Sequence, residues 1–343
     1  MTAPDASSPP IAPLVAPSGA PLVVLLGPTA SGKSALAVWL AERLRGEVVA
    51  CDSTQLYRGF DIGTAKPSLA ERRGVPHHLL GILDPHETAS AGDYRQRALA
   101  VLDDLRRRSR LPIFTVGTGL YLRALLEGLA DVPQRSEELR ARLRESAAAH
   151  PPGHLHRLLR RLDPAGAPRI APTDVQKIIR ALEICLLARR PLSEVHRAGR
   201  APLLGWRAVK IGLAPPREAL YARIQARLAS MLAAGWLDEV RHLLAAGLPE
   251  DAKPFDFIGY RELRAHLRGQ LSLAEAQAAI AQATRRYAKR QMTWFRRDPE
   301  IAWLEGFGDD PRVQEESLRL LAARGISVQS SSHGIPHSKP SND

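Results

Sequence analysis

The chain reads PLVVLLGPTASGKSALAVWLAERL at residues 21–44, and the rest of its architecture can be read outward from this segment. Its centre, GPTASGKS at 27–34, matches the pattern G-x-x-x-x-G-K-[ST], with an apolar strand before it and a helix after it. Two glycines permit a tight turn whose backbone N–H groups face one concavity, and a helix N-terminus attracts anions. Lys33 adds a mobile charge, and the Ser34 hydroxyl can bind Mg²⁺. The segment therefore predicts a phosphate-binding loop, without specifying which phosphorylated ligand it holds.

Strand-like and helix-like segments continue to alternate after this loop. Strands are predicted at residues 47–53 and 111–117, a helix at 93–108 between them, and strand character returns at 206–216. Such alternation predicts an α/β fold, a P-loop NTPase-like parallel sheet flanked by helices. A helical stretch is expected from Arg217 to about Phe295.

The strand pattern disappears between about residues 133 and 200, where an arginine-rich helical pattern is broken by Pro151–Pro152, Pro164 and Pro172. This predicts an all-helical insertion domain. The expected organisation is a disordered tail at 1–20, a P-loop-like catalytic domain made of 21–132 and 201–305, the insertion at 133–200, a C-terminal helical segment at 306–326 and a disordered tail at 327–343.

The composition is that of a globular protein, with 45% hydrophobic and 24% charged residues in a chain of 343. The longest apolar stretch, around Leu22 to Leu26, is too short to cross a bilayer, so no membrane partner is expected. The first basic residue is Lys33, which argues against a signal peptide. The two cysteines, Cys51 and Cys185, are far apart and support neither a disulfide framework nor a cysteine zinc site. A cytoplasmic, reducing setting fits.

The net charge of +12 favours a polyanionic partner, nucleic acid first and a membrane surface second. Its densest basic segment is ATRRYAKRQMTWFRR at 283–297, which contains no acidic residue. At about 100° per residue, Arg286, Arg290 and Arg297 fall on one side of a helix, a pattern typical of phosphate-backbone contacts. The neighbouring aromatics Tyr287 and Trp294 are expected to enter the core.

A second candidate site is CDSTQLYRGFDIGTAKP at 51–67, in which Asp52 ends a predicted strand beside the phosphate loop. Its carboxylate could hold Mg²⁺, as in Walker B motifs, or act as a general base, and its position alone leaves both roles open. The Gln55 amide suits an adenine edge, although a solvated loop residue is the commoner case. Thr118 lies between two glycines after another strand and could cap the next helix.

A third segment, TDVQKIIRALEI at 173–184, begins with a capping-box pattern from Thr173 to Gln176. Gln176, Lys177 and Arg180 should share one helix face. A solvated surface is the usual explanation for such a face.

In this order, the segments resemble one family, the tRNA dimethylallyltransferases, over about residues 22–305. The most specific matches are DSTQLYRGFDIGTAKP, FIGYRE and TRRYAKRQMTWFR. The resemblance implies a P-loop-like domain that binds dimethylallyl diphosphate rather than ATP, Mg²⁺ as cofactor, and an insertion that embraces the anticodon stem-loop. It implies transfer of the dimethylallyl group to the exocyclic N6 of the adenosine 3′ of the anticodon, at position 37, in tRNAs that read codons beginning with U. A monomer is expected.

The resemblance also implies roles for single residues. Asp52 matches the general base, Thr118 a threonine at the adenine end of the channel, and Arg227 an arginine near the diphosphate. The diphosphate-binding loop is matched by Gly27, Pro28, Thr29, Ala30, Ser31, Gly32, Lys33 and Ser34, with Ser34 the expected Mg²⁺ ligand. The tRNA-contacting residues are matched by Asp52, Ser53, Thr54, Gln55, Thr118, Arg140, Gln176, Lys177, Ile178, Ile179, Arg180, Asp256, Phe257, Ile258, Gly259, Tyr260, Arg261, Arg285, Arg286, Tyr287, Ala288, Lys289, Arg290, Gln291 and Met292.

The sequence departs from the family pattern at a few positions. Val116 stands where a glycine is common, Arg286 where a glutamine is frequent, and Lys177 where an arginine is frequent. These departures bear on details of RNA contact and not on the reaction.

Three other functions fit parts of the sequence. An adenylate isopentenyltransferase uses a free nucleotide and would not need the arginine-rich insertion. A P-loop small-molecule kinase would transfer a γ-phosphoryl group and usually carries an arginine-rich lid. A nucleotide-gated RNA-binding module would be expected to carry the guanine-specificity motif N-K-x-D, which is absent from the sequence.

Overall fold

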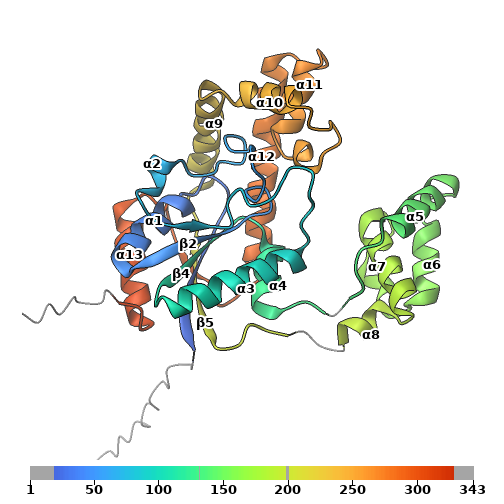
Figure 1. The fold of residues 1–343 in the computed structure, drawn as a ribbon, viewed down its shortest axis with the longest axis horizontal. Coiled ribbons are helices and arrows are strands. Elements are labelled where there is room, and N and C mark those ends of the chain that lie inside the picture. Colours follow the sequence, from blue (N-terminus) through green and yellow to red (C-terminus); the bar gives the residue numbers. More distant parts are fainter. Residues whose placement is uncertain (1–18, 131, 198–200, 328–343) are drawn as a thin grey trace, which may run out of the picture. The chain divides into compact units, whose positions relative to one another are not determined.

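The computed structural model describes residues 19–130, 132–197 and 201–327 (Figure 1). Within these ranges, the strands are β1 (Ala20–Leu26), β2 (Gly46–Cys51), β3 (His77–His78), β4 (Leu111–Val116), β5 (Trp206–Leu213) and β6 (Ala302–Leu304). They form one parallel sheet in the order β3-β2-β4-β1-β5-β6, which confirms the predicted fold class. The sequence did not reveal β3 and β6, because such short strands carry no readable periodicity.

The strand order corrects one expectation about the site. β4 lies between β1 and β2, so the strand that leads to Asp52 is not adjacent to the strand that leads to the phosphate loop. The three strands are parallel, however, and their carboxyl ends open on the same edge of the sheet. Ligands bind at that edge in open α/β sheets.

The chain divides into two compact units, and the first contains the sheet. It comprises the residues up to His86, then Leu102–Gly117 and the chain from Leu204 onward. Its helices are α1 (Lys33–Leu44), α2 (Leu69–Arg72), α9 (Arg217–Ala233), α10 (Trp236–Ala245), α11 (Tyr260–Leu267), α12 (Leu273–Phe295) and α13 (Pro311–Ala323), with a short 3-10 helix η2 (Lys253–Asp256). Helix α3 (Ala91–Arg107) has residues in both units.

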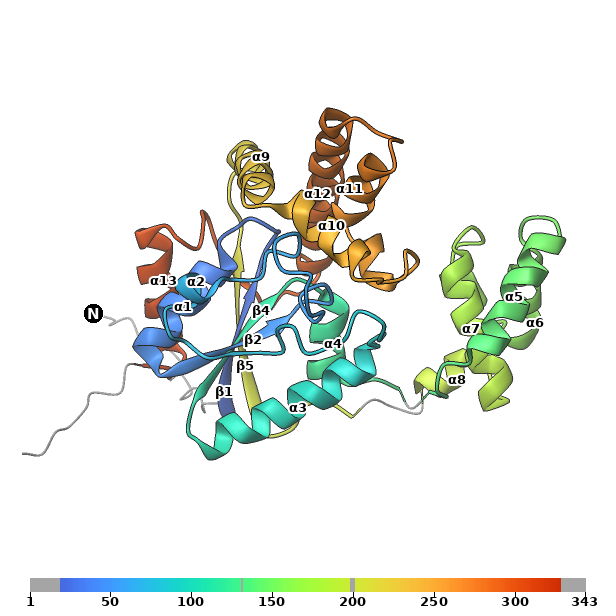
Figure 2. The same ribbon diagram turned by 45° about the horizontal axis from the view of Figure 1, so that its top comes forward.

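The core of the first unit fixes the position of α1, the helix that follows the phosphate loop. Leu36 and Leu40 of α1 are fully buried with Val23 and Leu25 of β1, and α13 adds Leu321 to the same cluster. Figure 2 shows α1 and α13 on the same side of the sheet. Burying such a side chain contributes about 1.5–3 kcal/mol, so the start of α1 is firmly held.

The predicted helical stretch from Arg217 to about Phe295 is four α-helices and η2 rather than one run. Gly235, with a φ of 94°, ends the first and begins α10, and Gly259, also at 94°, precedes α11. Left-handed backbone of this kind interrupts a helix, and glycine adopts it at low cost. A Cβ on Gly259 would also collide with the ring of Trp236.

The second unit, Glu87–Val101 and Thr118–Leu203, contains no strand among its described residues. Its helices are α4 (Gly119–Glu127), α5 (Glu137–Ala149), α6 (His154–Leu162), η1 (Ala167–Arg169), α7 (Val175–Ala188) and α8 (Leu192–Arg197). The unit is helical, but it also includes residues 87–101 and 118–132, which the sequence had grouped with the sheet. Those residues carry no break in composition that would have marked the boundary.

Helix α7 supplies much of the core of the second unit. Ile178 and Leu182 are buried against Leu155 and Leu159 of α6. The helix begins one residue later than the sequence predicted: Asp174, not Thr173, is the N-cap.

The Asp174 carboxylate accepts a hydrogen bond from the backbone N–H of Lys177 at 3.1 Å, and an ionised cap of this kind is a strong one.

The predicted tails lie outside the described residues except at their inner ends, where Ala20 begins β1. No described helix has the length and apolarity needed to span a membrane.

Candidate active site

The predicted phosphate loop joins β1 to α1 through left-handed backbone at Ala30 (φ 64°) and Gly32 (φ 87°). Gly27 is required as glycine, because a Cβ there would lie 2.9 Å from the carbonyl oxygen of Leu213. α1 begins at Lys33 without a side-chain cap. Its first-turn N–H groups are therefore placed to receive an anion.

Lys33 folds back onto the loop that carries it. Its Nζ donates hydrogen bonds to the carbonyl oxygens of Gly27 at 3.0 Å and Pro28 at 2.9 Å. Burial lowers the pKa of Lys33 to about 8; the negative charge of Asp52 opposes this shift, and the positive charge of Arg227 adds to it. An incoming diphosphate would supply the negative charge that stabilises the ammonium form.

A cavity of about 440 Å³ opens at the carboxyl edge of the sheet, entirely within the first unit. It brings together predicted residues from distant segments, namely the loop residues Thr29–Ser34, Asp52, Gln55, Arg227, Tyr287 and Gln291. It is also lined by residues that the sequence did not single out, namely Thr64, Ala65, Glu71, Thr115, Arg223, Ala226 and Ser230. Thr64 and Ala65 lie within the segment at 51–67 but were not distinguished from its other residues. Thr115 lies in β4, Glu71 in α2 and the other three on α9, where no motif marks them.

Asp52 follows β2 directly, and its carboxylate is held on both sides. Oδ1 accepts hydrogen bonds from the backbone N–H of Thr54 at 2.9 Å and from its hydroxyl at 2.8 Å. Oδ2 faces Gly117, the residue after β4: a Cβ built on Gly117 would lie 1.8 Å from Oδ2. Gly117 is therefore needed because Asp52 occupies the space of a side chain, a reason that the sequence alone did not reveal.

Gln55 lines the cavity, but its amide is already engaged. Nε2 donates to the carbonyl oxygens of Thr64 at 3.2 Å and Ala65 at 3.1 Å. Both amide hydrogens thus hold the loop at 64–65 in place. Reading an adenine edge, as the sequence suggested, would fall to Oε1 alone.

Two arginines one turn apart on α9 line the cavity. Burial lowers the pKa of Arg227, while the carboxylate of Glu71 raises it. Arg223 makes a two-pronged ion pair with Asp309, with both N–O distances at 2.7 Å. Next to Asp309, the N–H of Gly308 donates to the carbonyl oxygen of Ser31 at 2.9 Å. The segment after β6 therefore supports the phosphate loop. The sequence predicted no such role for residues 306–326.

The residues present fit a diphosphate accompanied by Mg²⁺. The Ser31 hydroxyl is buried in the loop without a hydrogen-bond partner among the described residues, so a ligand oxygen would satisfy it. Ser34 and Asp52 are oxygen donors that the cavity offers a cation, and the carboxylate of Glu71 also lines it. No group of three or more His, Cys, Asp or Glu residues in the described ranges could hold a metal by itself. Mg²⁺ commonly takes one or two protein ligands plus phosphate oxygens and water, which matches this sparse donor set.

Thr118 is the N-cap residue of α4 in the second unit, yet its side chain makes no capping hydrogen bond. Thr118 therefore holds the N-cap position that the sequence suggested, but it caps α4 without its side chain. Its placement at the adenine end of a channel stays a prediction.

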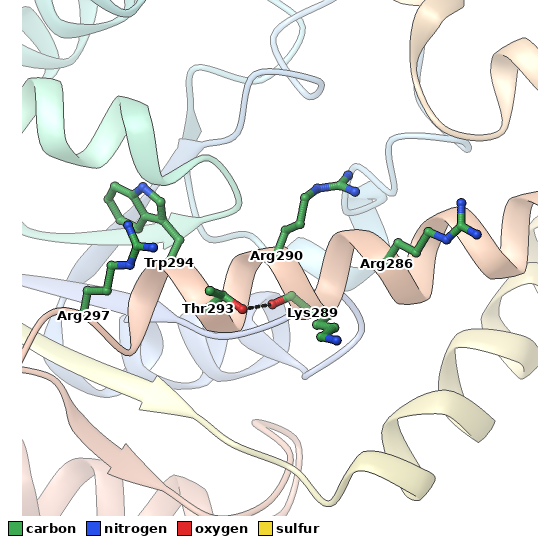
Figure 3. Close-up of a pocket in the computed structure, with 6 residues that line it drawn as sticks. All are labelled: Arg286, Lys289, Arg290, Thr293, Trp294 and Arg297. Carbon is green, nitrogen blue, oxygen red and sulfur yellow. Dashed lines mark hydrogen bonds between the residues drawn. The ribbon is translucent and has the colours of Figure 1, made fainter. Parts of the chain in front are cut away.

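A second hollow of about 410 Å³ lies along the C-terminal half of α12, and we call it the α12 groove (Figure 3). It is lined by Arg286, Lys289, Arg290, Thr293, Trp294 and Arg297. None of these lining side chains is acidic, and Arg286 and Arg290 project from the same side of the helix. The groove extends beyond Met292, the last tRNA-contacting residue that the resemblance implies, to Arg297, which the basic pattern of 283–297 had included.

Tyr287 and Trp294 of α12 do not enter the core as expected. Trp294 is half-buried and lines the α12 groove. Tyr287 reaches the cavity of the other site, where its hydroxyl donates to the carbonyl oxygen of Gly117 at 2.9 Å.

In the second unit, two predicted RNA-contacting arginines share one buried carboxylate. Arg140 binds Glu183 through two N–O contacts of 2.9 Å, and Arg180 binds it at 2.5 Å. Burial alone would raise the pKa of Glu183, but these bonds outweigh it and lower the pKa to about 2. Gln176 and Lys177 are exposed, as an RNA contact requires.

Several other predicted RNA-contacting side chains are buried. Ile178, Ile179, Tyr260, Ala288 and Gln291 are each at most 5% exposed. The hydroxyl of Tyr260 donates to Glu239 at 2.5 Å, and Glu239 accepts backbone N–H groups from residues 61–63. Tyr260 thus supports the loop at 61–63 from within the core, through Glu239.

Comparisons with known proteins identify the family to which this chain belongs. Residues 55–298 match the family model described as IPP transferase. The tRNA dimethylallyltransferase of Solibacter usitatus is 52% identical over 304 residues, covering 88% of this chain and 98% of that protein. The corresponding protein of Koribacter versatilis is 51% identical over 300 residues, covering 88% and 97%. The crystal structure of the tRNA isopentenylpyrophosphate transferase of Bacillus halodurans is 36% identical, with a TM-score of 0.64 over 89% of this chain and 97% of that one. The chain belongs to the IPP transferase family.

Proposed function

We propose that this protein transfers the dimethylallyl group of dimethylallyl diphosphate to the exocyclic N6 of adenosine 37, 3′ of the anticodon, in tRNAs that read codons beginning with U. The products are N6-dimethylallyladenosine and diphosphate. The observation that carries the proposal is the cavity in which Asp52 faces the same space as Lys33, Arg227 and the phosphate loop. A carboxylate and a diphosphate site in one cavity suit a reaction that removes a proton as diphosphate departs.

The loop and the two cations bind the leaving group. The first-turn N–H groups of α1 and the Ser31 hydroxyl face its oxygens, and Lys33 and Arg227 supply positive charge as the bond to carbon breaks. Ser34 would hold Mg²⁺, and Asp52 is assigned to the proton. When bound, Mg²⁺ neutralises part of the charge on the diphosphate.

Asp52 acts on the nucleophile. The neutral N6 amine attacks the allylic carbon, the carbon–oxygen bond to diphosphate breaks, and Asp52 accepts the amine proton as the carbon–nitrogen bond forms. The hydrogen bonds from Thr54 to Oδ1 fix the direction of the carboxylate. The adenine must leave its stack to reach this cavity, which costs little in a single-stranded loop.

The α12 groove supports an RNA substrate rather than a free nucleotide. Arg286, Lys289, Arg290 and Arg297 place four positive charges along it, which matches an extended phosphate backbone. The net charge of +12 acts in the same direction. We expect a monomer that acts in the cytoplasm, where its tRNA substrate is found.

One assay tests the proposal against its alternatives. The protein is incubated with labelled dimethylallyl diphosphate and Mg²⁺, together with unmodified tRNA or AMP; a parallel reaction contains γ-labelled ATP. Label in tRNA, recovered after digestion as N6-dimethylallyladenosine, supports the proposal. Label in AMP would identify an adenylate isopentenyltransferase, and label transferred from ATP a kinase. Chelation of Mg²⁺ in the tRNA reaction should abolish product.

A further inference from the structure

One side chain of α12 links two segments that carry different parts of the site. Oε1 of Gln291 accepts the backbone N–H of Thr29 at 2.8 Å, and Nε2 donates to the carbonyl oxygen of Gly117 at 2.9 Å. Gln291 is 5% exposed. Both polar atoms of its amide are therefore engaged inside the protein.

Each partner of Gln291 touches a functional group. Thr29 lies in the phosphate loop, and its N–H is committed to Gln291 rather than directed toward an anion. Gly117 contacts the carboxylate of Asp52 so closely that no side chain fits between them. Moving Thr29 shifts the leaving-group site, and moving Gly117 shifts the base.

Tyr287, one turn before Gln291, strengthens the second contact. Its hydroxyl donates to the same carbonyl oxygen of Gly117, also at 2.9 Å. A carbonyl oxygen accepts two hydrogen bonds, so the carbonyl of Gly117 is fully engaged by α12, while its N–H donates to the carbonyl oxygen of Cys51 at 3.0 Å. Tyr287 and Gln291 both hold Gly117 from α12, but only Gln291 also binds the phosphate loop, through Thr29.

We propose that Gln291 is a positioning residue that sets the separation between the phosphate loop and Asp52, and that it does not contact tRNA. This inference rests on the proposed function and reassigns a residue that the family resemblance had placed in an RNA-contacting segment. Misplacing reacting groups by about 1 Å can cost on the order of 10²-fold in rate, so a link of this kind matters to the chemistry.

The first test replaces Gln291 by methionine, which has similar length but neither donor nor acceptor. We expect Gln291→Met to lower kcat at saturating substrates by about 10²-fold, with the tRNA Kd within about twofold of wild type. Gln282→Ala, at an exposed glutamine of the same helix, is the matched control and should change neither parameter. Arg290→Ala, in the α12 groove, should show the opposite split and raise the tRNA Kd.

The second test uses Gln291→Glu. The ionised carboxylate can accept the Thr29 N–H but repels the Gly117 carbonyl, whereas the protonated acid has the same donor and acceptor pattern as the amide. The kcat of this variant relative to wild type should therefore rise as the pH is lowered. A residue that only fills space would show a constant ratio.

Thermal melting shows whether the Gln291 variants are folded. If they are not, Tyr287→Phe tests the same contact with Gly117. Its kcat should fall less than that of Gln291→Met, because Gln291 still holds Gly117, and its tRNA Kd should stay unchanged. Weakened tRNA binding with an unchanged single-turnover rate in either variant would overturn the proposal, as would wild-type kinetics in both. If wild-type protein prenylates no tRNA, the proposed function fails instead.

Discussion

The ammonium of Lys33 donates a hydrogen bond to the carbonyl oxygen of Pro28 over 2.9 Å, so that the cation of the phosphate loop is held by the loop itself. A diphosphate competes for the same ammonium and brings charge that a neutral carbonyl lacks. Lys33→Ala should therefore raise the KM for dimethylallyl diphosphate and lower kcat, with kcat/KM down by about 10²-fold or more. Steady-state kinetics at saturating tRNA measure both constants. If both constants stayed near their wild-type values, Lys33 would have no role in binding diphosphate.

The lowered pKa of Lys33 predicts a pH dependence. Burial favours the neutral amine in the free protein, with a pKa of about 8, whereas bound diphosphate raises the pKa by stabilising the ammonium. Below pH 8 the lysine is charged in both states, and kcat/KM for dimethylallyl diphosphate should be flat. Above pH 8 binding must take up a proton, so kcat/KM should fall, approaching about tenfold per pH unit. Lys33→Arg, which stays charged, should lose this decline if it retains activity.

Much of the site follows from sequence because its motifs lie where parallel strands end. The loop at 27–34 and Asp52 each follow an apolar run, and such runs predict strands without knowledge of the partner strand. The sequence marks Gly117 only as a neighbour of Thr118. The requirement for glycine there arises because β4 pairs with β2, which places Gly117 against Asp52.

The contacts that were missed join segments far apart in the chain. Gln291 reaches Thr29 across 262 residues, and Asp309 reaches Arg223 across 86. Neither pair has a local spacing or composition that would identify it. The same limit explains Ile178, Ile179 and Tyr260: the resemblance marks whole segments, whereas the core selects which side chains of a segment face outward.

Gly117→Ala is a steric test of the base. The new methyl group would fall 1.8 Å from Oδ2 of Asp52 and must displace the carboxylate or the end of β4. We expect kcat to fall by about 10²-fold or more, with little change in tRNA affinity. Gly92→Ala, in α3, is the matched control, because its nearest neighbour would be at 3.4 Å and alanine favours a helix. An active Gly117→Ala enzyme would show that Asp52 need not hold its observed position.

Asp52→Asn separates the two roles that remain open for this residue. The amide keeps the shape but cannot accept a proton, so loss of a general base should lower kcat by about 10²–10⁴-fold with small changes in substrate affinity. If Asp52 mainly holds Mg²⁺, excess Mg²⁺ should restore much of the rate. We expect little rescue in a magnesium titration at saturating substrates. Full rescue would assign Asp52 to the metal.

The α12 groove makes a prediction about salt. Each phosphate contact releases counterions, so the tRNA Kd should rise with salt concentration, and removing one contact should lower the slope of log K against log salt by about 1. Arg297→Ala, beyond the tRNA-contacting residues that the family resemblance implies, should weaken tRNA binding and reduce this slope, while the KM for dimethylallyl diphosphate stays unchanged. Arg319→Ala, an exposed arginine of α13 outside the groove, is the control and should leave the slope unaltered. Equal slopes for wild type and Arg297→Ala would limit the RNA surface of α12 to the residues before Thr293.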